Sequence, residues 1–264
     1  MHKNLLAYED YEKFSSNDVE KRYKLNKLEQ AKKNVSFIDR LNQGKVSVLE
    51  LGSGNSKFLY ALALADKLEA GVGIEVSQDR HDFAEKWRKE LDCKSVTNLF
   101  WDVLTLPSYV FDNKKYDITY CVDLAFQFFD PVSPGSDLEV LNKMFEATKI
   151  GGHIVLELDT HNRLISKMEN NKLKTWQSFE DPDPWEFLLW DCEQHENTIE
   201  INKTFINRRS MKRSKSSVVL KNYSRDDIIS LLERVGFKNC FIEERWQESG
   251  DLLEDEFIVV GERV

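Results

Sequence analysis

The sequence predicts an α/β fold: a doubly wound, seven-stranded, mostly parallel sheet with an antiparallel last strand, an N-terminal helical lid and an inserted antiparallel β cap. Through the first 160 residues, short β-type runs alternate with helical stretches, the pattern of parallel strands joined by crossover helices. Later β-type runs follow one another without helical stretches, which indicates antiparallel pairing. The last two runs are separated by a loop too short for a crossover helix, so they should also pair antiparallel.

We expect a single domain over residues 1–264, built from four parts. Residues 1–43 are the helical lid, because apolar residues recur at helical spacing between Val19 and Leu41. Residues 44–160 are the core, and residues 161–223 are the inserted cap. Residues 224–264 return to the core with a helix capped by Ser224 and two strands. The expected strands are 46–51, 71–76, 96–101, 116–122, 153–158, 185–190, 198–207, 216–223, 237–246 and 256–261, and the expected core helices are 57–68, 78–91, 137–148 and 225–235.

Composition excludes several classes of protein. The 264 residues, 41% of them hydrophobic, suffice for one substantial core. The four cysteines lie far apart without a CxxC pair, which favours free thiols over disulfides or a zinc site. No apolar run approaches the length of a membrane span, and the N-terminus has no apolar signal region. We therefore expect a cytoplasmic protein with neither a membrane partner nor a metal.

The charge distribution disfavours nucleic acid as a partner. A net charge of −9 does not suit a surface that must neutralise many phosphates. One stretch between Ile206 and Lys221 is locally basic and contains no acid. Its cations are Arg208, Arg209, Lys212, Arg213, Lys215 and Lys221. We favour a solvated hairpin tip, and the alternative is a site for an anionic group of a substrate.

A glycine-rich turn after the first expected strand is the first candidate binding site. Gly52 and Gly54 allow a sharp turn and a close ligand approach, at the strand ends where nucleotide-like ligands bind. Glu75 ends the second expected strand, 23 positions after Gly52, where a carboxylate can accept hydrogen bonds from ribose hydroxyls. Lys57 stands where a dinucleotide-binding motif has its third glycine, and there is no P-loop motif. NAD(P) and a phosphate-cradling loop are therefore disfavoured.

With these motifs, the chain resembles the class I S-adenosylmethionine-dependent methyltransferases of the small-molecule type. The resemblance covers Val46 to about Leu158 and extends to the approach to the sixth strand at residues 223–237. Its motifs are Glu50-Leu51-Gly52-Ser53-Gly54, Gly73-Ile74-Glu75-Val76, Trp101-Asp102-Val103, the run from Tyr116 to Asp123, and the Gly-Gly turn in Lys149-Ile150-Gly151-Gly152-His153. It implies a Rossmann-like sheet, a cofactor-binding core over residues 44–160 and S-adenosylmethionine as the cofactor.

The resemblance also implies roles for individual residues. The backbone of residues 52–54 would approach the methionine part of the cofactor, Glu75 would hold the ribose, and Asp102 would accept from the adenine amino group. Two alternatives are structural: Asp102 as a turn cap, and Glu50 as a satisfied strand-end carboxylate instead of a partner of the cofactor's amino group. The expected cofactor-binding residues are Glu50, Gly52, Ser53, Gly54, Glu75, Val76, Asp102, Val103, Asp123 and Leu124.

The acceptor side is predicted from chemistry. Aromatic faces suit a sulfonium cation, so the candidate substrate-binding residues are Tyr8, Tyr11, Phe126, Phe129 and Trp185, each of which packing alone would also explain. His161 follows the fifth expected strand and is a candidate general base, with a surface-loop histidine as the alternative. Asp123 is the second catalytic candidate. Alignment of the reactants can lower the activation barrier by about 7–11 kcal/mol. A general base accelerates the reaction by roughly 10²–10⁴-fold, which corresponds to a smaller lowering of the barrier.

The sequence therefore predicts an S-adenosylmethionine-dependent N- or O-methyltransferase that acts on a small-molecule metabolite by direct in-line transfer. The cap favours a closed pocket and hence a small acceptor. Phe126, Phe128 and Phe129 depart from the Asn/Asp-Pro-Pro-aromatic motif of amino-methylating nucleic-acid enzymes, which disfavours base methylation. The alternatives are methylation of a peptide or RNA docked on the basic 208–221 stretch, an NAD(P)-dependent oxidoreductase, and a cofactor-binding protein without activity.

Overall fold

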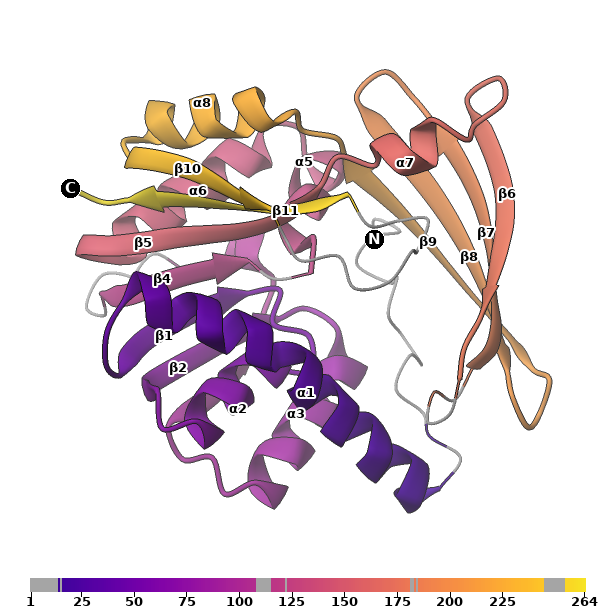
Figure 1. Cartoon of the computed structure of the whole chain (residues 1–264), viewed down its shortest axis with the longest axis horizontal. Helices are drawn as coiled ribbons and strands as arrows, with labels where there is room; N and C mark the ends of the chain where they lie inside the picture. Colours follow the sequence, from indigo (N-terminus) through magenta and orange to yellow (C-terminus); the bar gives the residue numbers. More distant parts are fainter. Residues whose placement is uncertain are drawn as a thin grey trace.

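The computed structural model describes residues 14, 16–107, 115–121, 123–180, 183, 185–244 and 255–264, and it contains two sheets (Figure 1). The larger sheet has seven strands in the order β10-β11-β5-β4-β1-β2-β3. Neighbouring strands from β3 to β5 are parallel, whereas β11 is antiparallel to both β5 and β10. The predicted fold class is thus confirmed. The strands are β1 (Val46–Leu51), β2 (Leu68–Glu75), β3 (Val96–Phe100), β4 (Tyr116–Cys121), β5 (Thr148–Asp159), β10 (Lys238–Glu244) and β11 (Glu256–Glu262).

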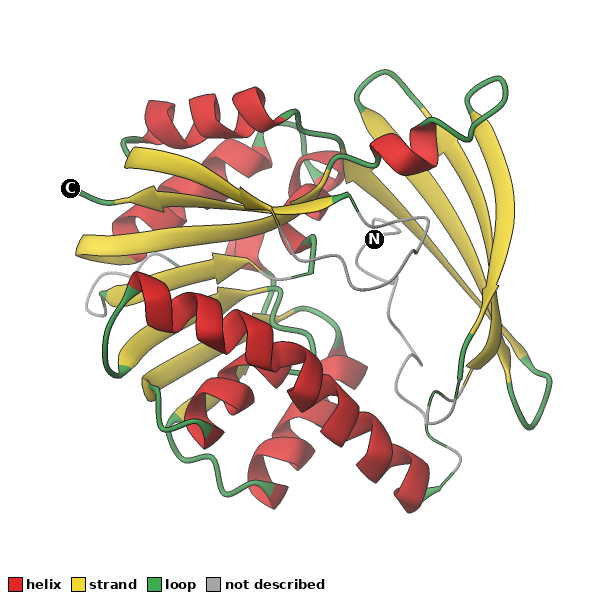
Figure 2. Cartoon of the chain, viewed as in Figure 1, coloured by secondary structure: helices red, strands yellow, loops and turns green. Residues whose placement is uncertain are grey.

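Helices cover both faces of this sheet (Figure 2). One face packs against α1 (Asn17–Leu41), α2 (Lys57–Leu64) and α3 (Gln78–Glu90). The other packs against α6 (Ser136–Ala147) and α8 (Arg225–Val235). All six residues of β1 are buried, as a strand enclosed on both faces requires. The Ser224 side chain accepts a hydrogen bond from the Asp227 N–H, so it caps α8 as predicted, and Gly236 ends the helix.

A second, four-stranded antiparallel sheet is inserted between β5 and α8. Its order is β6-β7-β8-β9, and each neighbouring pair is a hairpin. The strands are β6 (Lys172–Ser178), β7 (Trp185–Gln194), β8 (Thr198–Asn207) and β9 (Arg213–Lys221), and the short helix α7 (Asn162–Ile165) leads into them. The parallel strands of the larger sheet point their carboxyl ends toward this cap sheet (Figure 1). A ligand is therefore expected at the carboxyl ends of these strands.

Several expected boundaries were wrong. The helix predicted over 57–68 ends at Leu64, because the chain turns through Asp66 at a φ of 58° and enters β2 at Leu68. The expected Gly-Gly turn lies inside β5, which already begins at Thr148, and the Gly151 N–H donates to the Arg263 carbonyl at 2.6 Å. Strand β6 was not predicted, because its residues alternate only between exposed and half-buried positions and show no apolar stripe.

The described residues also bear on the excluded classes. The cysteines are free thiols, with Cys93, Cys121 and Cys192 buried and Cys240 partly exposed. Within the described ranges, no helix has both the length and the apolar character of a membrane span. Over the same residues, His, Cys, Asp and Glu form no group of three or more that could hold a metal ion.

Candidate active site

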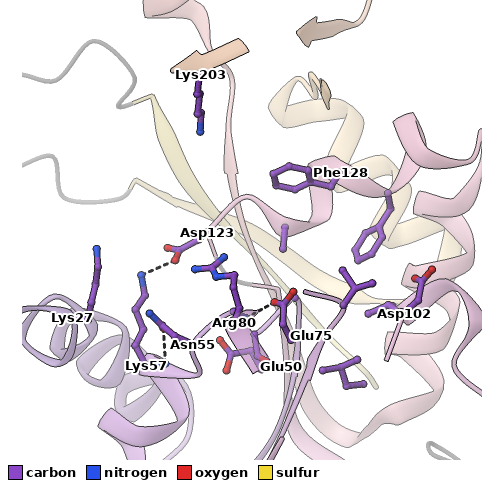
Figure 3. Close-up of a pocket in the computed structure, with 18 of the residues that line it drawn as sticks. Lys27, Glu50, Asn55, Lys57, Glu75, Arg80, Asp102, Asp123, Phe128 and Lys203 are labelled. Carbon is purple, nitrogen blue, oxygen red and sulfur yellow. Dashed lines mark hydrogen bonds and ion pairs between the residues drawn. The ribbon is translucent and has the colours of Figure 1, made fainter. Parts of the chain in front are cut away.

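A cavity of about 430 Å³ lies between the carboxyl ends of the parallel strands and the cap sheet (Figure 3). The core contributes the loops after β1, β2, β3 and β4, and α1 contributes Tyr23 and Lys27. The cap sheet contributes polar and apolar side chains from β6, β7 and β8, among them Gln177, Leu188, Trp190, Lys203 and Phe205. The cavity is therefore bounded by segments that are far apart in the sequence.

The loop between β1 and α2 forms the floor of the cavity. Gly52 and Gly54 have φ angles of +69° and +56°, a region that favours glycine. A Cβ on Gly52 would lie 2.6 Å from the Ala125 Cβ, so the loop packs directly against the segment after β4. The Ser53 N–H donates to the Ile74 carbonyl at 3.0 Å, which ties the loop to β2. The structure thus gives a physical reason for both glycines of this motif.

Glu75 at the end of β2 connects two loops of the site. Its Oε2 accepts a hydrogen bond from the Gly54 N–H at 2.7 Å, and its Oε1 accepts one from the Ser77 N–H at 2.7 Å. A carboxylate has about four lone-pair sites, so further donors can still be accommodated. The residue is buried at the cavity wall, where a ribose hydroxyl could reach the carboxylate. Val76, the next residue, also lines the cavity.

Glu50 is the most unusual acid of the site. It lies at the cavity floor in β1 and is 1% exposed, yet its Oε2 has no hydrogen-bond partner among the described residues. Burial, reinforced by the negative charge of Asp123, raises the pKa of Glu50 well above its ordinary value. An uncompensated buried carboxyl group is costly unless a ligand supplies a donor. The unpaired oxygen favours the role in which Glu50 binds the amino group of the cofactor. It does not fit the alternative, in which Glu50 is a strand-end carboxylate with its hydrogen bonds satisfied within the protein.

Asp102 both caps a turn and faces the cavity. Its Oδ1 accepts a hydrogen bond from the Leu104 N–H at 2.9 Å and caps the 3₁₀ helix η2 (Val103–Thr105). The capping role considered from the sequence is therefore present. Its Oδ2 has no partner in the described part of the chain and remains available to a ligand. Val103 is buried beside it at the cavity wall.

A buried hydrogen-bond network fixes the loop after β4. The Glu157 Oε2 accepts from the Asp123 N–H at 2.9 Å, and its Oε1 accepts from the Tyr120 hydroxyl and from the Asn34 side chain of α1. Asp123 and the next residue, Leu124, have positive φ angles of 47° and 64°. The Asp123 carboxylate faces the cavity and contacts the Lys57 Nζ at 2.6 Å (Figure 3). Leu124 itself does not line the cavity.

Only some of the aromatic residues predicted to bind the substrate lie at the cavity. Phe129 lines the cavity, together with Phe128 of the 3₁₀ helix η3 (Ala125–Phe128). Phe126 and Trp185 are buried in the packing and are not among the lining residues. Tyr8 and Tyr11 lie outside the described residues.

His161 lies close behind the cavity. It is 3% exposed, which makes it a buried residue rather than a surface-loop histidine, and it does not line the cavity. Burial lowers its pKa, although Asp159 opposes this effect. The Asp159 Oδ1 accepts the His161 N–H at 2.6 Å, which holds the turn that follows β5. The structure therefore brings together Glu50, Glu75, Asp102 and Asp123 but not His161.

Four cations of the site were not predicted as site residues: Lys27 of α1, Lys57 of α2, Arg80 of α3 and Lys203 of β8. Burial lowers the pKa of Lys27 and of Lys203 to about 8 in each case. The Arg80 guanidinium lies against the glycine loop, and its Cζ is 2.9 Å from the position of a Cβ on Gly54. Arg80 follows the acidic end of β2 by five positions, a signal that was available. Lys203 depends on the register of the cap sheet, which a sequence alone does not give.

The residues present fit S-adenosylmethionine. Glu50 offers an unsatisfied buried oxygen toward an amino group, and Asp102 offers Oδ2 toward a donor on a base. The glycines at 52 and 54 leave a floor without side chains, and Glu75 stands beside it. These groups are the ones the sequence motifs had marked, and they meet at one cavity.

Solved methyltransferase structures share this fold. An S-adenosylmethionine-dependent methyltransferase from Clostridium acetobutylicum superposes with a TM-score of 0.68 at 14% identity, covering 90% of this chain and 91% of that chain. The amino pentose methyltransferase CalS10 from Micromonospora echinaspora gives 0.66 at 15% identity, covering 96% and 99%. The sugar N-methyltransferase KedS8 from Streptoalloteichus gives 0.61 at 13% identity, covering 88% and 86%. At these identities the similarity establishes the fold.

The family follows from the sequence itself. Residues 42–208, more than half of the chain, match the family model described as a methyltransferase domain. No curated protein matches the chain. The chain therefore belongs to the methyltransferase domain family, and it is a class I methyltransferase that uses S-adenosylmethionine as its cofactor.

Proposed function

We propose that this methyltransferase transfers the methyl group to a nitrogen or oxygen atom of a small-molecule acceptor. The observation that carries the proposal is the cavity itself, because its two walls come from the strand ends and from the cap sheet. Its volume of about 430 Å³ falls within the roughly 300–1,000 Å³ of small-molecule sites. Two structural neighbours carry the descriptions amino pentose methyltransferase and sugar N-methyltransferase. Amino sugars are therefore the first acceptor class to test.

Within this proposal, the acids of the core hold the cofactor. Glu50 pairs with its amino group, Glu75 with the ribose hydroxyls and Asp102 with the adenine amino group. The support is the unsatisfied Glu50 Oε2, the remaining lone pairs of the Glu75 carboxylate and the unpartnered Asp102 Oδ2. Residues 52–54, Val76 and Val103 provide the surface on which the cofactor lies.

Bound S-adenosylmethionine supplies an activated methyl group, so the chain has to align the acceptor and exclude water. Asp123 is the proposed aligning residue, because its carboxylate faces the cavity and is held by Lys57. The N–H or O–H of an acceptor would donate to Asp123. His161 remains a candidate base, and its lowered pKa keeps it neutral at pH 7. Since it does not line the cavity, a proton would have to reach it through an intervening group.

The basic stretch at 208–221 offers less support for a macromolecular substrate. Arg208 contacts Glu186 at 2.8 Å and donates to the Trp185 carbonyl at 3.2 Å. Lys221 contacts both Asp130 and Asp137. Two of the cations that would dock RNA or an acidic peptide are thus engaged within the protein. The remaining ones lie at or near the β8–β9 turn, as the solvated-hairpin interpretation requires.

Two measurements test the proposal in order. Calorimetric titrations with S-adenosylmethionine, S-adenosylhomocysteine and NADH should show binding of the first two only. A screen with methyl-labelled donor should then transfer label to an amino sugar, with the corresponding hydroxyl sugar distinguishing nitrogen from oxygen. Transfer of label to RNA or to a peptide would refute the small-molecule assignment if the Lys212→Met substitution in the basic stretch abolished it.

A further inference from the structure

Lys203 enters the cavity from the cap sheet. It lies on β8 opposite Trp190 of β7, and its Nζ lies 4.7 Å from the centroid of the Trp190 ring. Figure 3 shows its side chain pointing from the cap toward the space above Asp123 and Arg80. The ammonium group is therefore presented to a ligand from the side opposite the glycine loop.

No counter-ion accompanies this cation in the described part of the chain. Among the described residues, no carboxylate lies within ion-pair distance of the Lys203 Nζ, and no hydrogen-bond acceptor contacts it. By contrast, the Nζ of the buried Lys24 lies 2.6 Å from both Glu20 and Glu90. A half-buried ammonium group without a carboxylate beside it is unfavourable. The pKa of Lys203 is accordingly low: burial and the nearby Arg80 lower it to about 8, whereas Cys192 acts in the opposite direction.

Other charged residues also line this cavity, but from the core side. Arg80 and Lys27 line the same cavity. Arg80 lowers the pKa of both Lys27 and Lys203, whereas Asp123 and Asp183 raise the pKa of Lys27. Asp123 is engaged by Lys57. Glu256, the cavity-lining acid of β11, is not among the groups that shift the pKa of Lys203. An anion entering from the cap side would meet the Lys203 ammonium group, which no carboxylate of the described residues contacts.

We propose that Lys203 binds a carboxylate or phosphate group of the methyl acceptor, whose apolar part contacts Trp190, Phe128 and Phe205. The proposal rests on the proposed function and narrows it to acceptors that carry an anionic group, such as an amino sugar that bears a phosphate or a carboxylate. The aromatic wall provides apolar contact area, and the ammonium group provides the charge. The opposite role, a neutral Lys203 that takes a proton from an uncharged acceptor, predicts no preference for anions.

Binding of matched probes distinguishes these roles. Benzoate and phenyl phosphate carry the two anionic groups on one ring, and benzyl alcohol is the neutral counterpart. Their dissociation constants are measured by calorimetry at pH 7 and constant ionic strength, with and without saturating S-adenosylhomocysteine. The proteins are wild type, Lys203→Met, Lys203→Arg and, as a matched control, Lys212→Met on the exposed β8–β9 turn.

The expected result is a preference of about tenfold or more for at least one anion over benzyl alcohol in the wild type. Lys203→Met should abolish the preference, whereas Lys203→Arg and Lys212→Met should keep it. Equal binding of anions and alcohol by the wild type, or an undiminished preference in a folded Lys203→Met protein, would overturn the inference. Failure of S-adenosylhomocysteine to bind would contradict the proposed function separately, and the titrations without it would still decide the role of Lys203.

Discussion

The Glu157 carboxylate on β5 accepts a hydrogen bond from the backbone N–H of Asp123 at 2.9 Å. This bond crosses from one strand end to the loop after the neighbouring strand, and it holds Asp123 at a φ of 47°. Because the Asp123 side chain faces the cavity, the orientation of a candidate catalytic group depends on a residue that does not itself line it. Asn34 of α1 donates to the same carboxylate, so the N-terminal helix also supports this loop.

Replacement of Glu157 by Gln should destabilise the protein and weaken cofactor binding. Glu157 accepts from three donors, and the amide of Gln would turn an N–H group toward at least one of them. We expect a loss of about 1–3 kcal/mol in the free energy of unfolding by urea. The affinity for S-adenosylhomocysteine should also fall. Tyr120→Phe, which removes one donor and leaves the Asp123 bond, should keep most of the affinity, and equal effects of the two variants would contradict the argument.

Glu50→Gln should stabilise the protein increasingly as the pH rises. The pKa of Glu50 is raised in the folded state, so its favourable contribution is complete below the unfolded value of about 4.3 and is lost as the pH rises toward the folded value. Glutamine does not titrate. The unfolding free energy of the variant should therefore gain on the wild type by up to about 1.4 kcal/mol per pH unit above pH 4.3. Parallel pH profiles of the two proteins would rule out an unpaired buried Glu50.

The same substitution should weaken cofactor binding even though it stabilises the fold. If the Glu50 carboxylate pairs with the cofactor's amino group, Glu50→Gln replaces a charge-assisted hydrogen bond by a neutral one. We expect the affinity for S-adenosylhomocysteine in calorimetry at pH 7.5 to fall about tenfold or more. A merely structural Glu50 would give the stabilisation without the loss of affinity, so the two readouts together separate these roles.

Gly52→Ala should lower the stability and the cofactor affinity more than Gly135→Ala, although both glycines have a positive φ. Gly52 has a φ of +69° and its Cβ position lies 2.6 Å from the Ala125 Cβ, whereas Gly135 has a φ of +82° and nothing within 4 Å. Gly135→Ala therefore measures backbone strain of about 1 kcal/mol alone. Gly52→Ala should cost more in thermal unfolding and should abolish binding of S-adenosylhomocysteine. Similar losses in both variants would mean that the contact with Ala125 is easily relieved.

Much of the core of this fold could be read from local sequence patterns. The strands β1 and β8 occupy the predicted ranges, because runs such as that at 46–51 combine β-branched residues with sharp boundaries. The cap of α8 by Ser224 is a local interaction and was equally readable. The acids at 50, 75 and 102 could be placed together because the carboxyl ends of parallel strands share one edge of the sheet.

The acceptor side depended on contacts that local patterns do not encode. Trp190 and Lys203 face each other only because β7 and β8 pair in one particular register. A shift of β8 by one residue would turn Lys203 to the other face of the sheet, away from Trp190. Local patterns also do not show which aromatic residues face a cavity: Phe126 of η3 and Trp185 of β7 were expected there and lie in the packing instead. Aromatic residues mark a core and a binding site equally well until the register is known.

The electrostatic state of Lys203 gives a prediction that needs no acceptor. Its folded-state pKa is lowered to about 8, so between pH 8 and its unfolded value of about 10.4 the unfolded chain binds the additional proton. Wild-type stability should then rise with pH relative to Lys203→Met across this window, because the unfavourable charge is lost from the folded state. At pH 7, where the charge is present, Lys203→Met should be the more stable protein in urea unfolding. Lys212→Met, at the exposed β8–β9 turn, should show neither effect, and a Lys203→Met profile that ran parallel to the wild type would mean that Lys203 has a counter-ion.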